Sequence, residues 1–166
     1  MPEFSGRLIA HGPVAIVVSR YNELITGRLL EGARAACGEA GVAVEQVDVI
    51  WVEGAFELPA VAAAAAATGR YTCIVGIGAV IRGDTPHFEY VAGEAARGLN
   101  AVAVEHRIPV AFGVLTVDTM EQAQARAGGD AGNKGHEAAS AAIAAADVIV
   151  QLRAAAAAGA GVALHA

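Results

Sequence analysis

The sequence has few basic residues and no paired cysteines. It contains 11 Lys and Arg against 17 Asp and Glu, so its formal net charge is −6 over 166 residues. A small and scattered basic minority argues against a nucleic-acid partner. Cys37 and Cys73 lack the close spacing of a zinc site or redox pair, so we expect two buried free thiols. The histidines are equally dispersed, and we expect no metal site.

Long apolar runs and familiar phosphate-binding signatures are also missing. No uninterrupted run of about 18 apolar residues is present, so we expect no membrane helix. No basic segment followed by an apolar one begins the sequence, and we expect a cytoplasmic protein. Gly76–Ile81 lacks the third glycine of a dinucleotide fingerprint, and Lys134 lacks the flanking residues of a P-loop. We therefore expect small metabolites as partners.

Hydrophobic residues make up 55% of the chain and form four short runs. A chain of this length and apolar content suits a single compact domain over residues 1–166. Apolar runs bounded by Gly, Pro or polar residues predict buried strands at Val14–Val18, Val47–Val52, Cys73–Ile81 and Pro109–Leu115. Helical spacing predicts helices at Ile25–Ala40, Leu58–Thr68, Phe88–His106, Met120–Ala127 and Gly135–Ala158.

The alternation of strands and helices predicts an α/β fold, a three-layer sandwich around a four-stranded parallel sheet of the flavodoxin-like type. Gly6–Ala10, within an N-terminal arm of about residues 1–12, is a candidate for an extra edge strand in this sheet or a neighbour's. The Ala- and Gly-rich tail at about 154–166 contains Gly159 and Gly161, which weaken a helix. We expect fraying there and assign the tail no function.

The loops after the four predicted strands hold most of the chemically capable residues. In an open parallel sheet these loops meet at the carboxyl ends of the strands, where ligands bind. The loop Arg82–His87 is the most informative, because Thr85 can cap a helix that begins at Pro86. The positive end of that helix would attract an anion such as phosphate.

Several side chains near this rim are candidates for binding and catalysis. His87 is the best proton-transfer candidate because histidine ordinarily titrates near neutrality, and Arg126 could grip a phosphate with two hydrogen bonds. Tyr21, Phe56 and Phe112 could form an aromatic slot for a flat heterocycle. Each residue alone has a structural alternative, namely surface exposure for the polar pair and core packing for the aromatics.

Taken in order, five separated motifs resemble the lumazine synthase family over nearly the whole chain. The motifs are Ser19–Asn22, Gly54–Pro59, Gly78–Phe88, Pro109–Thr116, and Arg126–Gly128 followed by Gly132–Gly135. The resemblance implies a transferase that condenses 5-amino-6-(D-ribitylamino)uracil with 3,4-dihydroxy-2-butanone 4-phosphate. The products would be 6,7-dimethyl-8-ribityllumazine, phosphate and water, in riboflavin biosynthesis and without a cofactor.

The resemblance also implies roles for particular residues. It makes His87 the acid/base residue and Lys134 an electrostatic support near the phosphate. The residues implied for the butanone phosphate are Asp84, Thr85 and Arg126. Those implied for the pyrimidine substrate are Tyr21, Ala55, Phe56, Glu57, Ala79, Val80, Ile81 and Phe112. The resemblance further implies that the chain assembles into pentamers or shells of pentamers, with each site shared between adjacent subunits. It also makes riboflavin synthase a candidate partner.

Three departures from the family pattern and two alternatives remain. Glu53 stands in place of a proline, Asp84 in place of a small or neutral residue, and Gly129-Asp130 in place of a Thr-Lys pair. The changes in charge predict weaker binding of the butanone phosphate. The alternatives are a non-catalytic relative that binds a flavin or lumazine or builds a shell, and a flavodoxin-like cofactor binder. Retention of His87 and Arg126 argues against the first.

Overall fold

Four parallel strands form the central sheet in the order β2-β1-β3-β4. The computed structural model describes residues 1–163, and for residues 159–163 it gives only the course of the helix. The strands are β1 (Val14–Ser19), β2 (Val47–Val52), β3 (Cys73–Ile81) and β4 (Val110–Val117). All four lie within two residues of the predicted runs. Every residue of β1 is buried, as a continuous apolar run in a central parallel strand requires.

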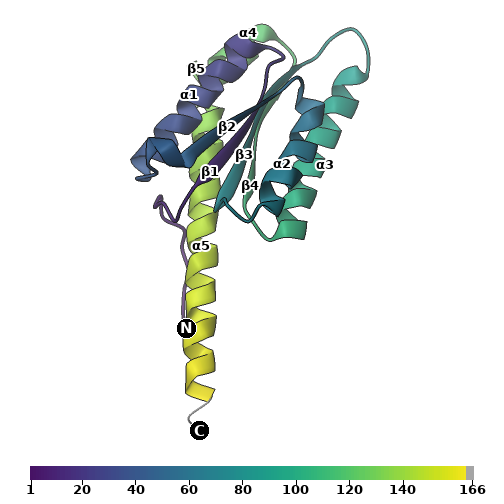
Figure 1. Ribbon diagram of the computed structural model, residues 1–166. Coiled ribbons are helices and arrows are strands. Elements are labelled where there is room, and N and C mark those ends of the chain that lie inside the picture. The colour runs from purple at the N-terminus through teal and green to yellow at the C-terminus, as the bar shows by residue number, and fades with distance from the viewer. Residues whose placement is uncertain (164–166) are drawn as a thin grey trace.

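Helices cover both faces of this sheet (Figure 1). On one face lie α1 (Glu23–Glu39) and α5 (Lys134–Ala163), and on the other α2 (Leu58–Ala67) and α3 (His87–His106). The short α4 (Met120–Arg126) leads into a small hairpin of β5 (Ala127–Gly129) and β6 (Gly132–Asn133). The arrangement confirms the predicted three-layer α/β sandwich of the flavodoxin-like type.

The alternation of side chains along the strands fills both halves of the core. In β1, Ile16 points to the α1 and α5 side, where it packs with residues such as Leu29 and Ile143. Its neighbour Val17 points to the α2 and α3 side and packs with residues such as Leu99. The layers are therefore fixed by strand periodicity, and the loops at the strand ends are left free for a binding site.

The N-terminal arm lies along α5 and contributes no strand to this chain's sheet. Asp147 of α5 is fully buried, and its carboxylate accepts hydrogen bonds from the backbone N and the Nε of Arg7, both at 3.0 Å. The ring of His11 lies 2.7 Å from the other carboxylate oxygen. A side chain at Gly6 would collide with the carbonyl oxygen of Ala144 in α5. These contacts explain why the prediction of Gly6–Ala10 as an edge strand is wrong for the chain's own sheet.

The C-terminal tail also differs from the prediction of a frayed end. Helix α5 continues through Gly159 and Gly161 as far as Ala163, since the strong helix propensity of the surrounding alanines outweighs two glycines. Residues 164–166 of the predicted tail lie outside the described residues.

Helix α5 is long and apolar enough over Lys134–Ala158 to cross a membrane, judged by length and composition alone. Composition therefore does not by itself support the expectation of no membrane helix. The first half of α5 packs into the protein core, where Ala139 is fully buried and Ile143 nearly so. Core helices of this kind pass the same length and composition test.

Candidate active site

A pocket of about 590 Å³ lies at the carboxyl ends of the strands. It is bordered by the loops after β1 and β2, the last residues of β3 and the first turns of α3, as the prediction from strand order requires. The predicted site residues that line it are Tyr21, Ala55, Phe56, Glu57, Ala79, Val80, Ile81, Thr85 and His87. Three of the four predicted loops thus contribute to one pocket.

The end of β3 gives this pocket a backbone edge. The pairing of β1 with β3 ends at Val18 opposite Ile77, so the last residues of β3 run on past β1. Successive residues of a parallel strand direct their peptide groups to opposite sides. Arg82 N donates to Val117 O at 2.9 Å, so Arg82 directs its peptide group toward β4. Ala79 and Ile81 lie an odd number of residues before Arg82, and they therefore direct their peptide groups to the opposite side, where the pocket lies. The Nδ2 of Asn22 already donates to Ala79 O at 2.9 Å.

The turn after β2 presents an aromatic ring and a carboxylate to the pocket. Glu57 Oε2 accepts a hydrogen bond from Gly54 N at 2.8 Å, which closes the turn around the buried Ala55. Phe56 at the apex is 56% exposed, and Tyr21 on the neighbouring loop is 73% exposed. Phe112 of β4 is 43% exposed. Core packing, the structural alternative for these three aromatics, is therefore wrong.

Helix α3 begins at His87, between the start at Pro86 predicted from the Thr85 cap and the start at Phe88 predicted from helical spacing. Pro86 adopts a turn conformation in the cap position, and Thr85 Oγ1 lies 3.5 Å from His87 N, at the limit of a hydrogen bond. Thr85 is therefore at most a weak cap. His87 occupies the first turn of the helix with its side chain exposed, and it borders the pocket directly.

Arg82, for which the sequence suggested no role, braces the loop that carries His87. Its Nε donates to Asp118 at 2.8 Å, its Nη1 donates to Glu89 at 2.6 Å, and its guanidinium lies 4.2 Å from the centre of the Phe88 ring. Hydrogen bonds to the two carboxylates raise the pKa of Arg82 above its usual value. The contacts tie the loop after β3 to the loop after β4 and to the first turn of α3.

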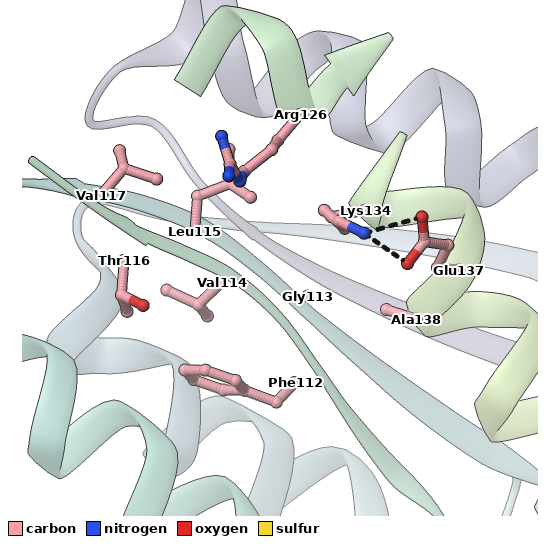
Figure 2. A pocket seen from close by; sticks show the side chains of 10 residues that line it. All are labelled: Phe112, Gly113, Val114, Leu115, Thr116, Val117, Arg126, Lys134, Glu137 and Ala138. Carbon is pink, nitrogen blue, oxygen red and sulfur yellow. Dashed lines mark hydrogen bonds and ion pairs between the residues drawn. The ribbon is translucent and has the colours of Figure 1, made fainter. Parts of the chain in front are cut away.

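A separate pocket of about 390 Å³ lies along β4 and is lined by three of the four remaining predicted residues, Phe112, Arg126 and Lys134 (Figure 2). Phe112 and the end of β4 form one side, and Arg126 and Lys134 enter from α4 and α5. Lys134 Nζ pairs with Glu137 at 2.8 Å, and Arg126 Nη1 donates to Gln122 O at 3.2 Å. Strand β4 is the last strand of the sheet, so its outer edge is open in the described chain.

The structure thus divides the predicted site between two pockets of one chain. Tyr21 and Phe56 line the first pocket and Phe112 lines the second, so the three do not form one slot within the chain. Thr85 and Arg126, both predicted for phosphate, are divided in the same way. Asp84 is exposed and lines neither pocket.

Two lining residues were missed although a sequence signal was available. Tyr90 and Val91 follow His87 at three and four residues, the spacing of neighbours on one face of a helix, and both line the first pocket. Tyr90 is 69% exposed, so it adds a further accessible ring to the pocket wall.

The two cysteines line neither of these pockets. Cys37 and Cys73 are buried free thiols, as predicted, and burial raises their pKa values to about 11 and about 12. Among residues 1–163 no group of three or more His, Cys, Asp or Glu side chains could hold a metal ion.

The fold and the first pocket define an α/β protein with a concave pocket at the carboxyl rim of its sheet, the place where open parallel sheets bind small molecules. A family model described as 6,7-dimethyl-8-ribityllumazine synthase matches residues 12–149. A 6,7-dimethyl-8-ribityllumazine synthase from Gemmatimonas aurantiaca is 52% identical over 144 residues, which cover 86% of this chain and 88% of that protein. The chain belongs to the 6,7-dimethyl-8-ribityllumazine synthase family, which confirms the resemblance drawn from the five motifs and supports a transferase enzyme.

Proposed function

We propose that this chain condenses 5-amino-6-(D-ribitylamino)uracil with 3,4-dihydroxy-2-butanone 4-phosphate to form 6,7-dimethyl-8-ribityllumazine, without a cofactor, in riboflavin biosynthesis. Membership of the family supports the reaction. The observation that carries the site is the position of His87, which borders a pocket walled by exposed aromatic rings and by the part of β3 that extends past β1. A small acidic protein of this kind would act on metabolites in the cytoplasm.

The first pocket suits the pyrimidine substrate. The peptide groups of Ala79 and Ile81 offer donors and acceptors to the edge of a uracil ring, while Tyr21 and Phe56 offer faces for stacking. The Glu57 carboxylate accepts hydrogen bonds from the ribityl hydroxyls. Ala55 and Val80 complete the wall.

The phosphate substrate needs groups that lie in both pockets. Thr85 and the start of α3 provide hydrogen-bond donors and a positive helix end beside His87. Arg126 and Lys134 provide positive charge, but they line the pocket along β4. A second copy of the chain that places its β4 pocket against the His87 pocket would complete the site, and the open edge of β4 suits such a contact. We therefore propose a ring of identical subunits, a pentamer or an assembly of pentamers.

The proposed reaction requires several proton transfers at one place. The pyrimidine amine attacks the ketone and water leaves as an imine forms. Loss of the proton from carbon 3 expels the phosphate and leaves an enol, which tautomerises to a new carbonyl with a methyl group beside it. The ribitylamino nitrogen then attacks this carbonyl, and loss of a second water closes the ring. His87 can accept and return the protons that these steps move. Arg126 and the start of α3 stabilise the departing phosphate, and the pocket holds the reacting atoms together.

The direct test is to mix the purified protein with both substrates and to follow the absorbance of the lumazine product. We expect a rate well above that of the spontaneous condensation, which serves as the background. A rate equal to that background in protein of native fold would contradict the proposed function.

A further inference from the structure

Another cavity, the amino-end cavity, lies at the opposite end of the sheet from the His87 pocket. Its volume is about 340 Å³, and it is bordered by Arg70–Thr72, which leads into β3, and His106–Pro109, which leads into β4. Residues from the middle of α5, between Ala146 and Arg153, form its other side. Because the strands are parallel, this end carries their amino termini. The length of β3, roughly 30 Å at about 3.3 Å per residue, separates it from the proposed active site.

The lining of the amino-end cavity is cationic although the chain is acidic. Arg70, Arg107, Arg153 and His106 line it, and no Asp or Glu does. Arg70 pairs with Asp48 at 3.1 Å just outside the lining. Arg107 and Arg153 form no ion pair with any side chain of residues 1–158. Two guanidinium groups without a carboxylate partner therefore border the same space.

The backbone of Arg107 adds an independent observation. Arg107 ends α3 in the left-handed conformation, with φ 53° and ψ 42°. Glycine or asparagine normally takes this position at the end of a helix, because other residues adopt it with strain. A strained backbone at a residue whose side chain borders a cavity points to a role for that side chain. Arg107 and Arg153 also border a second hollow of about 400 Å³, so both side chains line the two spaces.

The remaining walls suit the body of a small organic molecule. Ile108, Pro109 and Ile149 provide apolar surface. The hydroxyl of Tyr71 donates to Asp48 at 2.8 Å, which leaves the ring as the part that faces the cavity. A cavity of this size accommodates a small ligand, and guanidinium groups bind phosphate and carboxylate through paired hydrogen bonds.

We propose that the amino-end cavity binds a small organic anion, a phosphate or carboxylate on an apolar body, and that Arg107 and Arg153 hold its charged group. The site is separate from the proposed active site, and its occupancy does not depend on the proposed reaction. A metabolite bound there would contact the end of α3 and the segment that leads into β3, and both elements also reach the His87 pocket.

Calorimetric titration of the full chain with phenyl phosphate, benzoate and benzyl alcohol tests the proposal. We expect one of the two anions to bind and the neutral alcohol to bind at least tenfold more weakly. The stronger of the two anions identifies the preferred charged group. Arg107→Gly removes the guanidinium and introduces a residue that tolerates the left-handed backbone. Arg153→Gln removes the charge on α5 and leaves a polar side chain. Each should weaken binding of the anion at least tenfold, with an unchanged melting temperature as evidence of folding.

Two further variants distinguish binding in the amino-end cavity from binding elsewhere on the protein. Arg34→Gln removes an exposed charge from α1 and should leave the affinity within about twofold of wild type, because a distant surface charge is screened. Arg126→Gln alters the proposed active site and should leave this binding event in place. Loss of all anion binding in Arg126→Gln, or unchanged affinity in both Arg107→Gly and Arg153→Gln, would overturn the proposal, as would a wild-type chain that binds neither anion.

Discussion

His87 is the residue on which the proposed chemistry depends most. It starts α3 beside the backbone edge of β3, and its exposed side chain is free to meet a substrate. Replacement by alanine should slow turnover about 10²-fold, at the low end for general acid–base catalysis, and change KM little. Steady-state kinetics with both substrates measure this. His136→Ala is the matched control, since that histidine lines neither pocket and pairs with Glu39 at 2.9 Å, and equal losses in the two variants would contradict the role of His87.

Arg126 should contribute to binding of the butanone phosphate and not to binding of the pyrimidine. Arg126→Gln removes a charged hydrogen-bond donor, which should cost about 1.5–3 kcal/mol and raise the KM of the butanone phosphate by about 10- to 100-fold. The KM of the pyrimidine should stay near wild type. Arg97→Gln, on the exposed side of α3, should change neither value. If both substrates weakened equally, Arg126 would have a structural role and the proposed phosphate site would be wrong.

The arm-to-helix contact is the clearest feature at the scale of whole elements. Hydrogen bonds from Arg7, and then from His11, hold the pKa of the buried Asp147 well below its usual value. The unfolded chain therefore takes up a proton at this carboxylate first, near the ordinary aspartate pKa of about 3.9. The stability that Asp147 contributes is present above that pH and is lost as the pH falls further toward the folded-state value.

Asp147→Asn should consequently lower the urea midpoint of unfolding at neutral pH. The difference from wild type should stay constant above about pH 5 and shrink as the pH falls below about 4. Urea unfolding at a series of pH values from about 7 down to about 3 measures this difference. Asp130→Asn, in an exposed turn, is the control and should track wild type at every pH. A difference that is the same at low and neutral pH would show that Asp147 is not held as a charged group.

The elements that could be predicted from the sequence are those fixed by local pattern. The four strands lie within two residues of their predicted runs, because Gly, Pro or polar residues bound each apolar stretch. The arm could not be placed in this way. Its partner Asp147 lies 140 residues from Arg7 along the chain. Nothing in the sequence near Gly6–Ala10 indicates that this segment packs against a helix and not along the edge of a sheet.

The same distinction applies to the candidate site. Residues that share a loop or follow a strand directly, such as Phe56 and His87, were placed correctly in one pocket. Phe112 and Arg126 could not be placed, because their position depends on β4 being the outermost strand of the sheet. Strand order is set by long-range packing, so the division of the site into two pockets emerges only from the folded chain.

At the scale of the whole molecule, we propose that two copies of the chain complete each site. The His87 pocket and the β4 pocket of one chain contain complementary parts of the predicted machinery and are separate. In a closed ring each subunit would present its His87 pocket to one neighbour and its β4 pocket to the other. A ring therefore gives every subunit one complete site without any rearrangement within the chain.

Complementation between two impaired variants tests this shared site most directly. Subunits carrying His87→Ala and subunits carrying Arg126→Gln are co-expressed in equal amounts, and lumazine formation by the mixed assembly is measured under subsaturating butanone phosphate. About a quarter of the sites should combine an intact His87 pocket with an intact β4 pocket, so the mixture should recover about a quarter of wild-type activity. Activity no higher than the average of the two separate variants would contradict a site shared between subunits.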